Sequence, residues 1–249
     1  MSVEALKIGM PAPKPLRLAE SALFLDLDGT LAPIAARPQD VRPLPRRTRL
    51  LAQLRDRLEG RLAVITGRTL GDADRILEGC VTCVAAVHGL VRRDYDGSLH
   101  AREPHSGLAP ALSALRQFAT RDSGLIVEDK DASVALHFRL AAHHADAARA
   151  LARRLAVETG LALQDGDMVV ELRTPGPTKG DSVRAFMATE RFEGARPVFV
   201  GDDITDEHGF EEVARLGGYG VLVGLPRATH ARFRLPAVED VMDWLEAAR

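Results

Sequence analysis

The sequence predicts an α/β protein, with a doubly wound parallel-sheet core and a small α+β domain inserted into it. Short apolar runs alternate with helical patterns in the first hundred residues and again after residue 178. This alternation is typical of βαβ units, whose strands are buried on both faces. Between about residues 103 and 173 the order changes to helix, strand, strand, helix, strand, strand. That order indicates a separate domain with an antiparallel sheet.

The elements of the core follow from the spacing of apolar residues. Continuous apolar runs predict strands at residues 21–27, 61–65, 81–87, 197–200 and 220–223. Apolar residues at intervals of three and four predict helices at residues 44–58, 70–77, 179–190, 207–216 and 238–248. The first twenty residues contain three prolines and no clear period, so we expect them to be irregular.

The inserted domain is predicted by the same criteria. Helices are expected at residues 108–121 and 143–159, and strands at 124–128, 133–138, 161–164 and 168–172. Asp165-Gly166-Asp167 is typical of the turn of a β-hairpin. The expected domains are therefore residues 1–102 with 174–249 for the core, and residues 103–173 for the insertion.

Composition and charge exclude several classes of protein. A net charge of -2 argues against a general nucleic-acid binder. No apolar run approaches the roughly 18 to 20 residues that span a bilayer, and the first twenty residues lack the pattern of a signal peptide. We therefore expect a cytoplasmic protein, a monomer, with neither a membrane nor a nucleic acid as partner. Cys80 and Cys83 lie in an apolar run, which predicts buried thiols rather than half of a zinc site.

The most informative segment, residues 24–30, reads Phe-Leu-Asp-Leu-Asp-Gly-Thr. Asp26 and Asp28 leave the strand on the same side, because residues two apart on a strand share a face. Two like charges held this close need a cation or a proton between them. Mg²⁺ binds oxygen ligands and often keeps a phosphate among them, although an ordinary Asp-Gly turn also fits the segment. Gly29 allows the chain to turn sharply at this point.

Two further segments offer groups that bind anions. Val64-Ile65-Thr66-Gly67-Arg68 places a hydroxyl and a glycine N–H between a strand and a helix, where phosphate oxygens are often bound. Alone, such a segment is more often a simple turn. Thr178-Lys179-Gly180 opens a helix, and an isolated lysine there is more often solvated than catalytic.

The segment Gly201-Asp202-Asp203-Ile204-Thr205-Asp206-Glu207 places four acidic residues within six positions. These carboxylates would repel one another strongly without a cation. A helix N-cap accounts for Asp206 and Glu207. It accounts less well for Asp202 and Asp203, which favours a metal site.

Taken together and in this order, the four segments resemble the motifs of the haloacid-dehalogenase-like phosphatases. The resemblance implies that Asp26 is the nucleophile and forms an aspartyl phosphate. Asp28 would protonate the leaving oxygen and later deprotonate the attacking water. It also implies that Thr66 holds the transferring phosphoryl group and that Lys179 neutralises charge between the nucleophile and the phosphate.

The same resemblance implies a magnesium site and a set of substrate-binding residues. Asp202 would bind Mg²⁺ together with the Asp26 carboxylate and the Asp28 backbone carbonyl, and Asp203 and Asp206 would hold the waters of the metal. The expected substrate-binding residues are Gly67, Arg68, His88, Glu128, Lys130 and Glu171.

The inserted domain narrows the resemblance to the trehalose-6-phosphate phosphatases. Residues 127–130, 135–139 and 170–173 resemble motifs of the cap domain of that family, and the likeness covers residues 22–245. A disaccharide presents many hydroxyl groups, which carboxylates and amines such as Glu128, Lys130 and Glu171 would bind. Solvent-facing side chains on the strands of a cap would show the same residue types. Leu27 and the stretch 174–177 depart from the family pattern, and neither change removes a functional group.

The function expected from the resemblance is hydrolysis of trehalose 6-phosphate to trehalose and phosphate with Mg²⁺, the last step of trehalose biosynthesis. Phosphatases for sucrose phosphate or mannosyl-3-phosphoglycerate share this chemistry and differ in the cap. A phosphomutase or a phosphorylated receiver domain is a less favoured alternative. A dinucleotide-binding protein is disfavoured, because no Gly-x-Gly-x-x-Gly follows the first strand.

Overall fold

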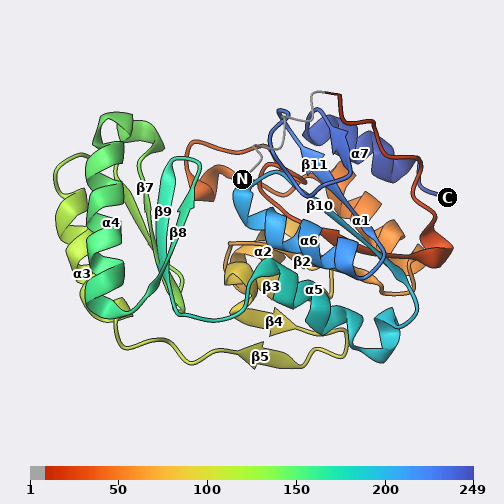
Figure 1. The fold of residues 1–249 in the computed structure, drawn as a ribbon, viewed down its shortest axis with the longest axis horizontal. Helices are drawn as coiled ribbons and strands as arrows, with labels where there is room; N and C mark the ends of the chain where they lie inside the picture. Colours follow the sequence, from red (N-terminus) through yellow and green to blue (C-terminus); the bar gives the residue numbers. More distant parts are fainter. Residues whose placement is uncertain (1–8) are drawn as a thin grey trace, which may run out of the picture. The chain divides into compact units, whose positions relative to one another are not determined.

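The computed structural model describes residues 9–249 and divides into two compact units (Figure 1). One unit comprises the chain up to His100 together with Pro177–Arg249, and the other is Ala101–Gly176. The expected boundaries, after residues 102 and 173, lie two and three residues from these. Of the irregular segment expected at the amino terminus, residues 1–8 lie outside the described residues.

The first unit is built on an eight-stranded sheet in the order β12-β11-β10-β1-β2-β3-β4-β5. Its strands are β1 (Ser21–Leu25), β2 (Leu62–Ile65), β3 (Cys83–Ala86), β4 (Val91–Arg93), β5 (Leu99–Ala101), β10 (Arg196–Gly201), β11 (Tyr219–Val223) and β12 (Phe233–Leu235). From β12 to β3 every neighbouring pair is parallel, and β4 is antiparallel to β3. The α/β core is therefore mostly parallel, as expected.

Three strands, β4, β5 and β12, have no counterpart among the expected elements. Each is only three residues long and at least partly exposed over most of its length. Three residues are too few to show either a continuous apolar run or an alternation, so the sequence carries no clear signal for them.

The centre of this sheet aligns the ends of three strands. In the registers of β1 with β10 and β2, Leu25 lies beside both Val200 and Val64. All five residues of β1 are buried. The segments that follow these strands therefore meet at the carboxyl edge of the sheet, where ligands of open α/β sheets bind.

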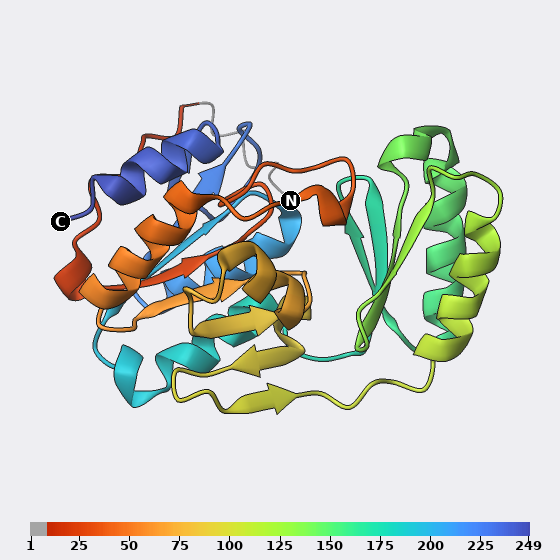
Figure 2. The same ribbon diagram turned by 180° about the vertical axis from the view of Figure 1, so that it is seen from behind.

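Helices cover both faces of this sheet (Figures 1 and 2). On one face lie α1 (Pro45–Arg57), α2 (Leu70–Leu77) and α7 (Val238–Glu246), and on the other lie α5 (Lys179–Met187) and α6 (Glu207–Arg215). Arg46 of α1 forms ion pairs with three acidic residues of α7, and the buried Arg47 donates to the Ile76 carbonyl in α2. On the opposite face, Phe24 of β1 stacks on Phe192, with ring centroids 5.6 Å apart.

The second unit packs two helices on one face of an antiparallel sheet (Figure 2). Its strands, in the order β6-β7-β9-β8, are Ile126–Asp129, Ser133–His137, Val169–Arg173 and Ala162–Gly166. The helices are α3 (Leu108–Ala119) and α4 (Ala145–Thr159). Val134, Leu136, Val170 and Leu172 belong to the same buried cluster as apolar residues of the helices. The alternate residues of these strands point to the opposite face.

Most helix ends lie within two residues of expectation, and two of the differences coincide with a bend in the chain. The helix expected from residue 143 begins at Ala145, after the 3₁₀ segment η4 (Arg139–His144), in which Ala141 has non-helical φ and ψ angles of -138° and 51°. The helix expected to run to residue 190 ends at Met187, and a 3₁₀ turn (Glu190–Phe192) follows.

Both cysteines are buried and free, as the sequence predicted. Cys83 lies in β3 and Cys80 precedes it, and burial raises the pKa of the Cys83 thiol to about 12. Across residues 9–249, no helix is both long and apolar enough to span a bilayer.

Candidate active site

Asp26 and Asp28 follow the central strand β1. The Asp26 side chain is buried, and the backbone N–H of Asp26 donates to the Val200 carbonyl of β10 at 2.9 Å. Gly29 has a φ of 77°, in the left-handed region that favours glycine. A Cβ on Gly29 would overlap the carboxylate of Asp202. The glycine therefore lets the turn after β1 approach the acidic segment after β10.

Three carboxylates, from Asp26, Asp202 and Asp206, meet at this edge. Their nearest oxygens all lie within 4.8 Å of one another. Burial, with the Asp206 and Asp202 charges, raises the pKa of Asp26 well above its usual value. Burial and the charges of Asp206 and Asp203 raise the pKa of Asp202 to about 7. The protein thus holds like charges together at a cost in stability.

One buried lysine lies between two of these carboxylates. Lys179 Nζ is 3.0 Å from Asp26 Oδ1 and 2.6 Å from Asp206 Oδ1. Burial alone would lower the pKa of Lys179, but the two carboxylates raise it above its usual value. Lys179 is the first residue of α5, where Thr178 and Asp181 form a capping box. The cap fixes the start of the helix and so the position of the amine.

The three carboxylates and the single ammonium leave a surplus of negative charge in a buried place. A divalent cation would balance this surplus and relieve the repulsion that raises the two pKa values. The donors are carboxylate oxygens, which hard cations prefer to nitrogen or sulfur. The residues present therefore fit a divalent metal ion.

Asp28 and Asp203, also expected near the metal, have other partners. Asp28 accepts two hydrogen bonds from Arg68, at 2.6 Å from Nε and 2.7 Å from Nη2. Asp203 caps the 3₁₀ turn Ile204–Asp206, and its N–H donates to Asp206 Oδ2 at 2.9 Å. Neither carboxylate belongs to the group of three. The Asp28–Arg68 pair joins residues 40 positions apart, so no local pattern in the sequence predicts it.

Thr66, Gly67 and His88 form the neighbouring part of the edge. The Thr66 hydroxyl accepts the Arg68 N–H at 3.1 Å, and the Thr66 carbonyl accepts the His88 N–H at 2.9 Å. A Cβ on Gly67 would lie 2.5 Å from His88 Nε2. Val87 and His88 both have positive φ angles, of 47° and 57°, and strained backbone of this kind is common at functional sites.

In the second unit, the strand face opposite the helices is polar. Glu128, Ala135, Glu171 and Gln164 lie in one row across the four strands. Lys130 Nζ donates to Glu171 Oε2 at 3.0 Å, and His137 Nε2 lies 2.8 Å from Glu128 Oε2. Burial alone would raise the pKa of Glu128, but His137 and Lys130 leave it below its usual value. We call this surface the polar face.

The sequence reasoning missed two members of the polar face. The Ser133 hydroxyl donates to Glu171 Oε1 at 2.5 Å, and Gln164 is the neighbour of Glu171 on β8. The sequence did contain a signal for Ser133. Side chains alternate between the two faces of a strand, so Ser133 lies on the same side as Ala135 and His137.

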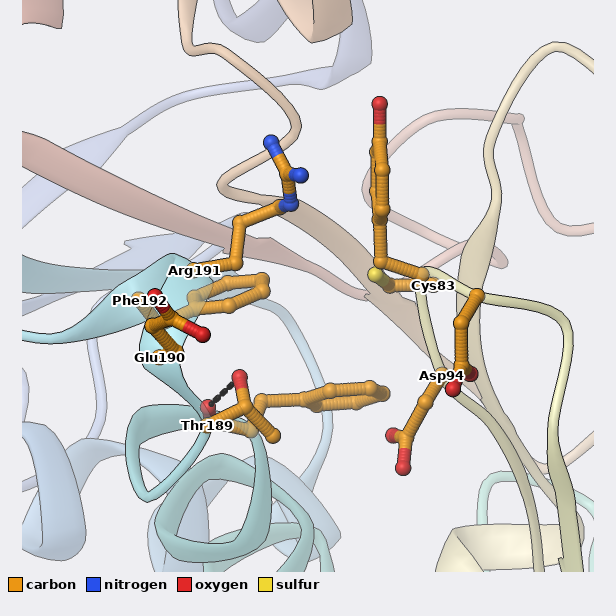
Figure 3. A pocket seen from close by; sticks show the side chains of 9 residues that line it. Cys83, Asp94, Thr189, Glu190, Arg191 and Phe192 are labelled. Atoms are coloured by element: carbon orange, nitrogen blue, oxygen red, sulfur yellow. Dashed lines mark hydrogen bonds between the residues drawn. The ribbon is translucent and has the colours of Figure 1, made fainter.

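A cavity of about 530 Å³ lies at another part of the first unit (Figure 3). Its wall includes Cys83, the first residue of β3, and Arg191, whose guanidinium stacks on Tyr95 with its carbon 3.7 Å from the ring centroid. It is therefore near the amino end of the parallel strands, whereas Asp26 and Asp202 follow their carboxyl ends. None of the expected site residues lines it.

Comparison with known proteins identifies the family of the chain. The family model described as trehalose-phosphatase matches residues 24–238. The chain belongs to this family. Its members are phosphate-ester hydrolases, so the chain is a phosphatase with a small-molecule phosphate ester as substrate.

Two relatives illustrate the similarity. Trehalose-6-phosphate phosphatase of Escherichia coli (strain K12) is 40% identical over 230 residues, which cover 92% of this chain and 86% of the relative. A probable trehalose-phosphate phosphatase of Sinorhizobium fredii is 38% identical, over 88% of this chain and 83% of the relative.

Solved structures show the same fold. A trehalose-6-phosphate phosphatase related protein superposes with a TM-score of 0.73 at 27% identity, covering 90% of this chain and 95% of that one. The C-terminal domain of a trehalose-6-phosphate phosphatase of C. albicans has a TM-score of 0.82 at 22% identity, covering 95% and 97%. The fold is that of the haloacid-dehalogenase-like proteins, as the sequence predicted.

Proposed function

We propose that this phosphatase hydrolyses trehalose 6-phosphate to trehalose and phosphate, with Mg²⁺ as its metal ion. The observation that carries the proposal is the buried group of Asp26, Asp202, Asp206 and Lys179 at the carboxyl edge of the sheet. Membership of the trehalose-phosphatase family and the names of the two relatives support this substrate.

The metal would be held by the carboxylates of Asp26 and Asp202 and by the backbone carbonyl of Asp28. When bound, Mg²⁺ neutralises charge on the phosphoryl group and orients it for an in-line displacement. Asp206 accepts from both Lys179 and the Asp203 N–H, so its carboxylate is fixed for supporting metal-bound waters. Asp203 would support the metal-bound waters together with Asp206.

In the first step an Asp26 carboxylate oxygen attacks phosphorus, and the bond from phosphorus to the sugar oxygen breaks. The product is an aspartyl phosphate on Asp26 and a free sugar. Lys179, 3.0 Å from Asp26 Oδ1, stabilises the negative charge as it shifts onto the phosphoryl oxygens. The Thr66 hydroxyl and the Gly67 N–H bind the remaining phosphoryl oxygens.

Asp28 moves the protons of both steps. It gives a proton to the departing sugar oxygen, then takes one from the water that attacks phosphorus and releases phosphate. Both Asp28 oxygens accept from Arg68 in this structure, so one must first be released. Arg68 releases it by turning to the substrate, since a guanidinium binds phosphate oxygens as well as it binds a carboxylate.

The second unit acts as the cap that selects the sugar. Its polar face offers the acceptors Glu128 and Glu171 and the donor Lys130, and a disaccharide with many hydroxyl groups needs both kinds. His88 would contact the substrate from the first unit. We further propose that the protein is a cytoplasmic monomer and that no nucleic acid is its partner.

The test is phosphate release from trehalose 6-phosphate, sucrose 6-phosphate, mannosyl-3-phosphoglycerate and glucose 6-phosphate, each with Mg²⁺ and with a chelator. We expect release that requires Mg²⁺ and a preference for trehalose 6-phosphate of at least about 10²-fold in kcat/KM. Equal rates on all four substrates would refute the proposed specificity. Transfer of the phosphoryl group to a second hydroxyl of the sugar would indicate a phosphomutase instead.

A further inference from the structure

A second group of metal-binding side chains lies in the second unit, away from the polar face. It consists of Asp122, in the turn after α3, and His143 and His144, at the end of η4 just before α4. Asp122 Oδ2 is 3.3 Å from His143 Nε2 and 3.7 Å from His144 Nε2. The three ligand atoms all lie within 4.8 Å of one another.

The two distances to the Asp122 oxygen are close to the edge of a tetrahedral metal site. With bonds of about 2.0 to 2.2 Å to nitrogen and carboxylate oxygen, neighbouring ligands of a tetrahedral Zn²⁺ lie about 3.3 to 3.5 Å apart. The 3.3 Å separation agrees with that value, and the 3.7 Å one needs a change of only a few tenths of an ångström. Three side chains occupy three corners, and a water would take the fourth.

The same separations are poor for hydrogen bonds. A strong N–H···O bond has a length of about 2.7 to 3.2 Å, so the 3.7 Å separation of His144 is too long and the 3.3 Å separation of His143 is at the upper limit. The two rings also lie close together, with centroids 4.3 Å apart, and would repel each other if both were positively charged. A metal ion bound to both neutral rings fits this arrangement better than two ion pairs.

The surrounding residues hold the ligands in these positions. The second oxygen of Asp122 accepts the Gly124 N–H at 2.7 Å, which leaves Oδ2 directed at the imidazoles. His144 packs edge-on against Phe118, with ring centroids 6.0 Å apart. A Cβ on Gly124 would lie 2.6 Å from the Leu140 carbonyl oxygen, so the glycine lets the turn after α3 pack against η4. Contacts of this kind around ligands raise metal affinity.

We propose that Asp122, His143 and His144 bind one transition-metal ion such as Zn²⁺. Two imidazoles and one carboxylate select a borderline metal rather than Mg²⁺, which prefers oxygen ligands. The ion would join the end of α3 to the start of α4, and so close the chain segment that carries β6 and β7. Its role is to stabilise the second unit, because a ligand that binds the folded state alone shifts the equilibrium toward it. The proposal does not depend on the function proposed above.

The test is a titration of the tag-free full-length protein with Co²⁺ and Zn²⁺ in saturating Mg²⁺. We expect one equivalent of Co²⁺ to give the visible absorption of a four- or five-coordinate nitrogen and oxygen site, and Zn²⁺ to displace it and raise the Tm. His143→Ala should weaken binding at least about tenfold. Since the His143 side chain is 69% exposed, this change leaves the fold intact, which circular dichroism would verify.

Two matched variants make the result decisive. His100 pairs with Asp94 on the first unit at 2.9 Å, and a single imidazole with one carboxylate cannot form a three-ligand site. His100→Ala should therefore leave the affinity unchanged. Equal Zn²⁺ affinity of the parent and His143→Ala proteins would overturn the proposal. So would loss of the bound Co²⁺ spectrum in Asp202→Asn with retention in His143→Ala, which would assign the ion to the Asp26 group.

Discussion

The acidic residues of the two units differ in how their charges are balanced. At the edge of the first unit, three carboxylates share one ammonium, and the pKa values of Asp26 and Asp202 are raised. On the polar face, Glu128 and Glu171 have basic partners, and the pKa of Glu128 is lowered. An unbalanced group is ready for a cation and an incoming phosphate, whereas a balanced group is suited to binding a neutral sugar.

The largest effect should come from removing the nucleophile of the unbalanced group. Asp26→Asn should lower kcat for trehalose 6-phosphate by at least about 10³-fold, because no aspartyl phosphate can form. It should also raise the Tm of the chelated protein, since one of the repelling charges is gone. Phosphate release and thermal unfolding measure the two effects. Asp56→Asn, at an exposed position, is the control, and a variant that retains the parent rate would refute the role of Asp26.

Removing the only cation of the group should reduce both stability and activity. Lys179→Met leaves buried carboxylates without their partner, which costs about 3–5 kcal/mol in the free energy of unfolding. Denaturant unfolding of the chelated protein measures this loss, and Lys14→Met, at an exposed position, is the control. The double variant Lys179→Met with Asp206→Asn should recover part of the stability while remaining inactive. A single variant as stable as the parent would contradict the charge imbalance.

A substitution on the polar face should weaken substrate binding and leave the rate of the chemical step unchanged. Glu171→Gln should raise KM for trehalose 6-phosphate by about 10- to 100-fold and leave the hydrolysis of p-nitrophenyl phosphate nearly unchanged, because that substrate has no sugar. Glu158→Gln, on the exposed side of α4, should change neither. If Glu171→Gln lowered the activity on both substrates equally, Glu171 would act in catalysis or in folding rather than in recognition of the sugar.

The smallest effect is a contrast in pH dependence, measured as Tm in chelator from pH 8 to 3. Asp202 has a folded pKa of about 7 against an ordinary 3.8, so the folded state takes up a proton first and stability rises as pH falls through this window. Glu128 has a lowered pKa, so it loses its stabilising contribution as pH falls below about 4.5.

The two variants should therefore change opposite parts of the curve. Asp202→Asn should remove the rise in Tm between pH 7 and 4, and Glu128→Gln should remove part of the decline in Tm below that. If both variants flattened the same part of the curve of Tm against pH, the two units would not differ in how their charges are balanced.

The sequence predicted those features that depend on neighbours along the chain. The apolar runs located β1, β2 and β3, and the acidic segments at the ends of the first and fourth of the predicted core strands contain the three carboxylates that meet in the structure. The family resemblance added a role for each residue. These signals are local, because a buried strand and the turn after it are encoded within about ten residues.

Features that depend on contacts between distant residues could not be predicted. The Asp28–Arg68 pair, the position of Lys179 between two carboxylates, and the row from Glu128 to Gln164 all require the register of strands or the packing of helices. A shift of one residue in any register would turn these side chains to the other face. Local patterns in the sequence are not enough to predict which register forms.

The most direct test of the account is to trap the reaction intermediate. The protein would be mixed with trehalose 6-phosphate carrying a labelled phosphoryl group, with Mg²⁺, and quenched in acid within one turnover. We predict label on the peptide that contains Asp26, sensitive to hydroxylamine and absent in Asp26→Asn. Steady release of labelled phosphate with no labelled peptide, or with label on another residue, would contradict the claim that the unbalanced group of the first unit carries out the reaction through Asp26.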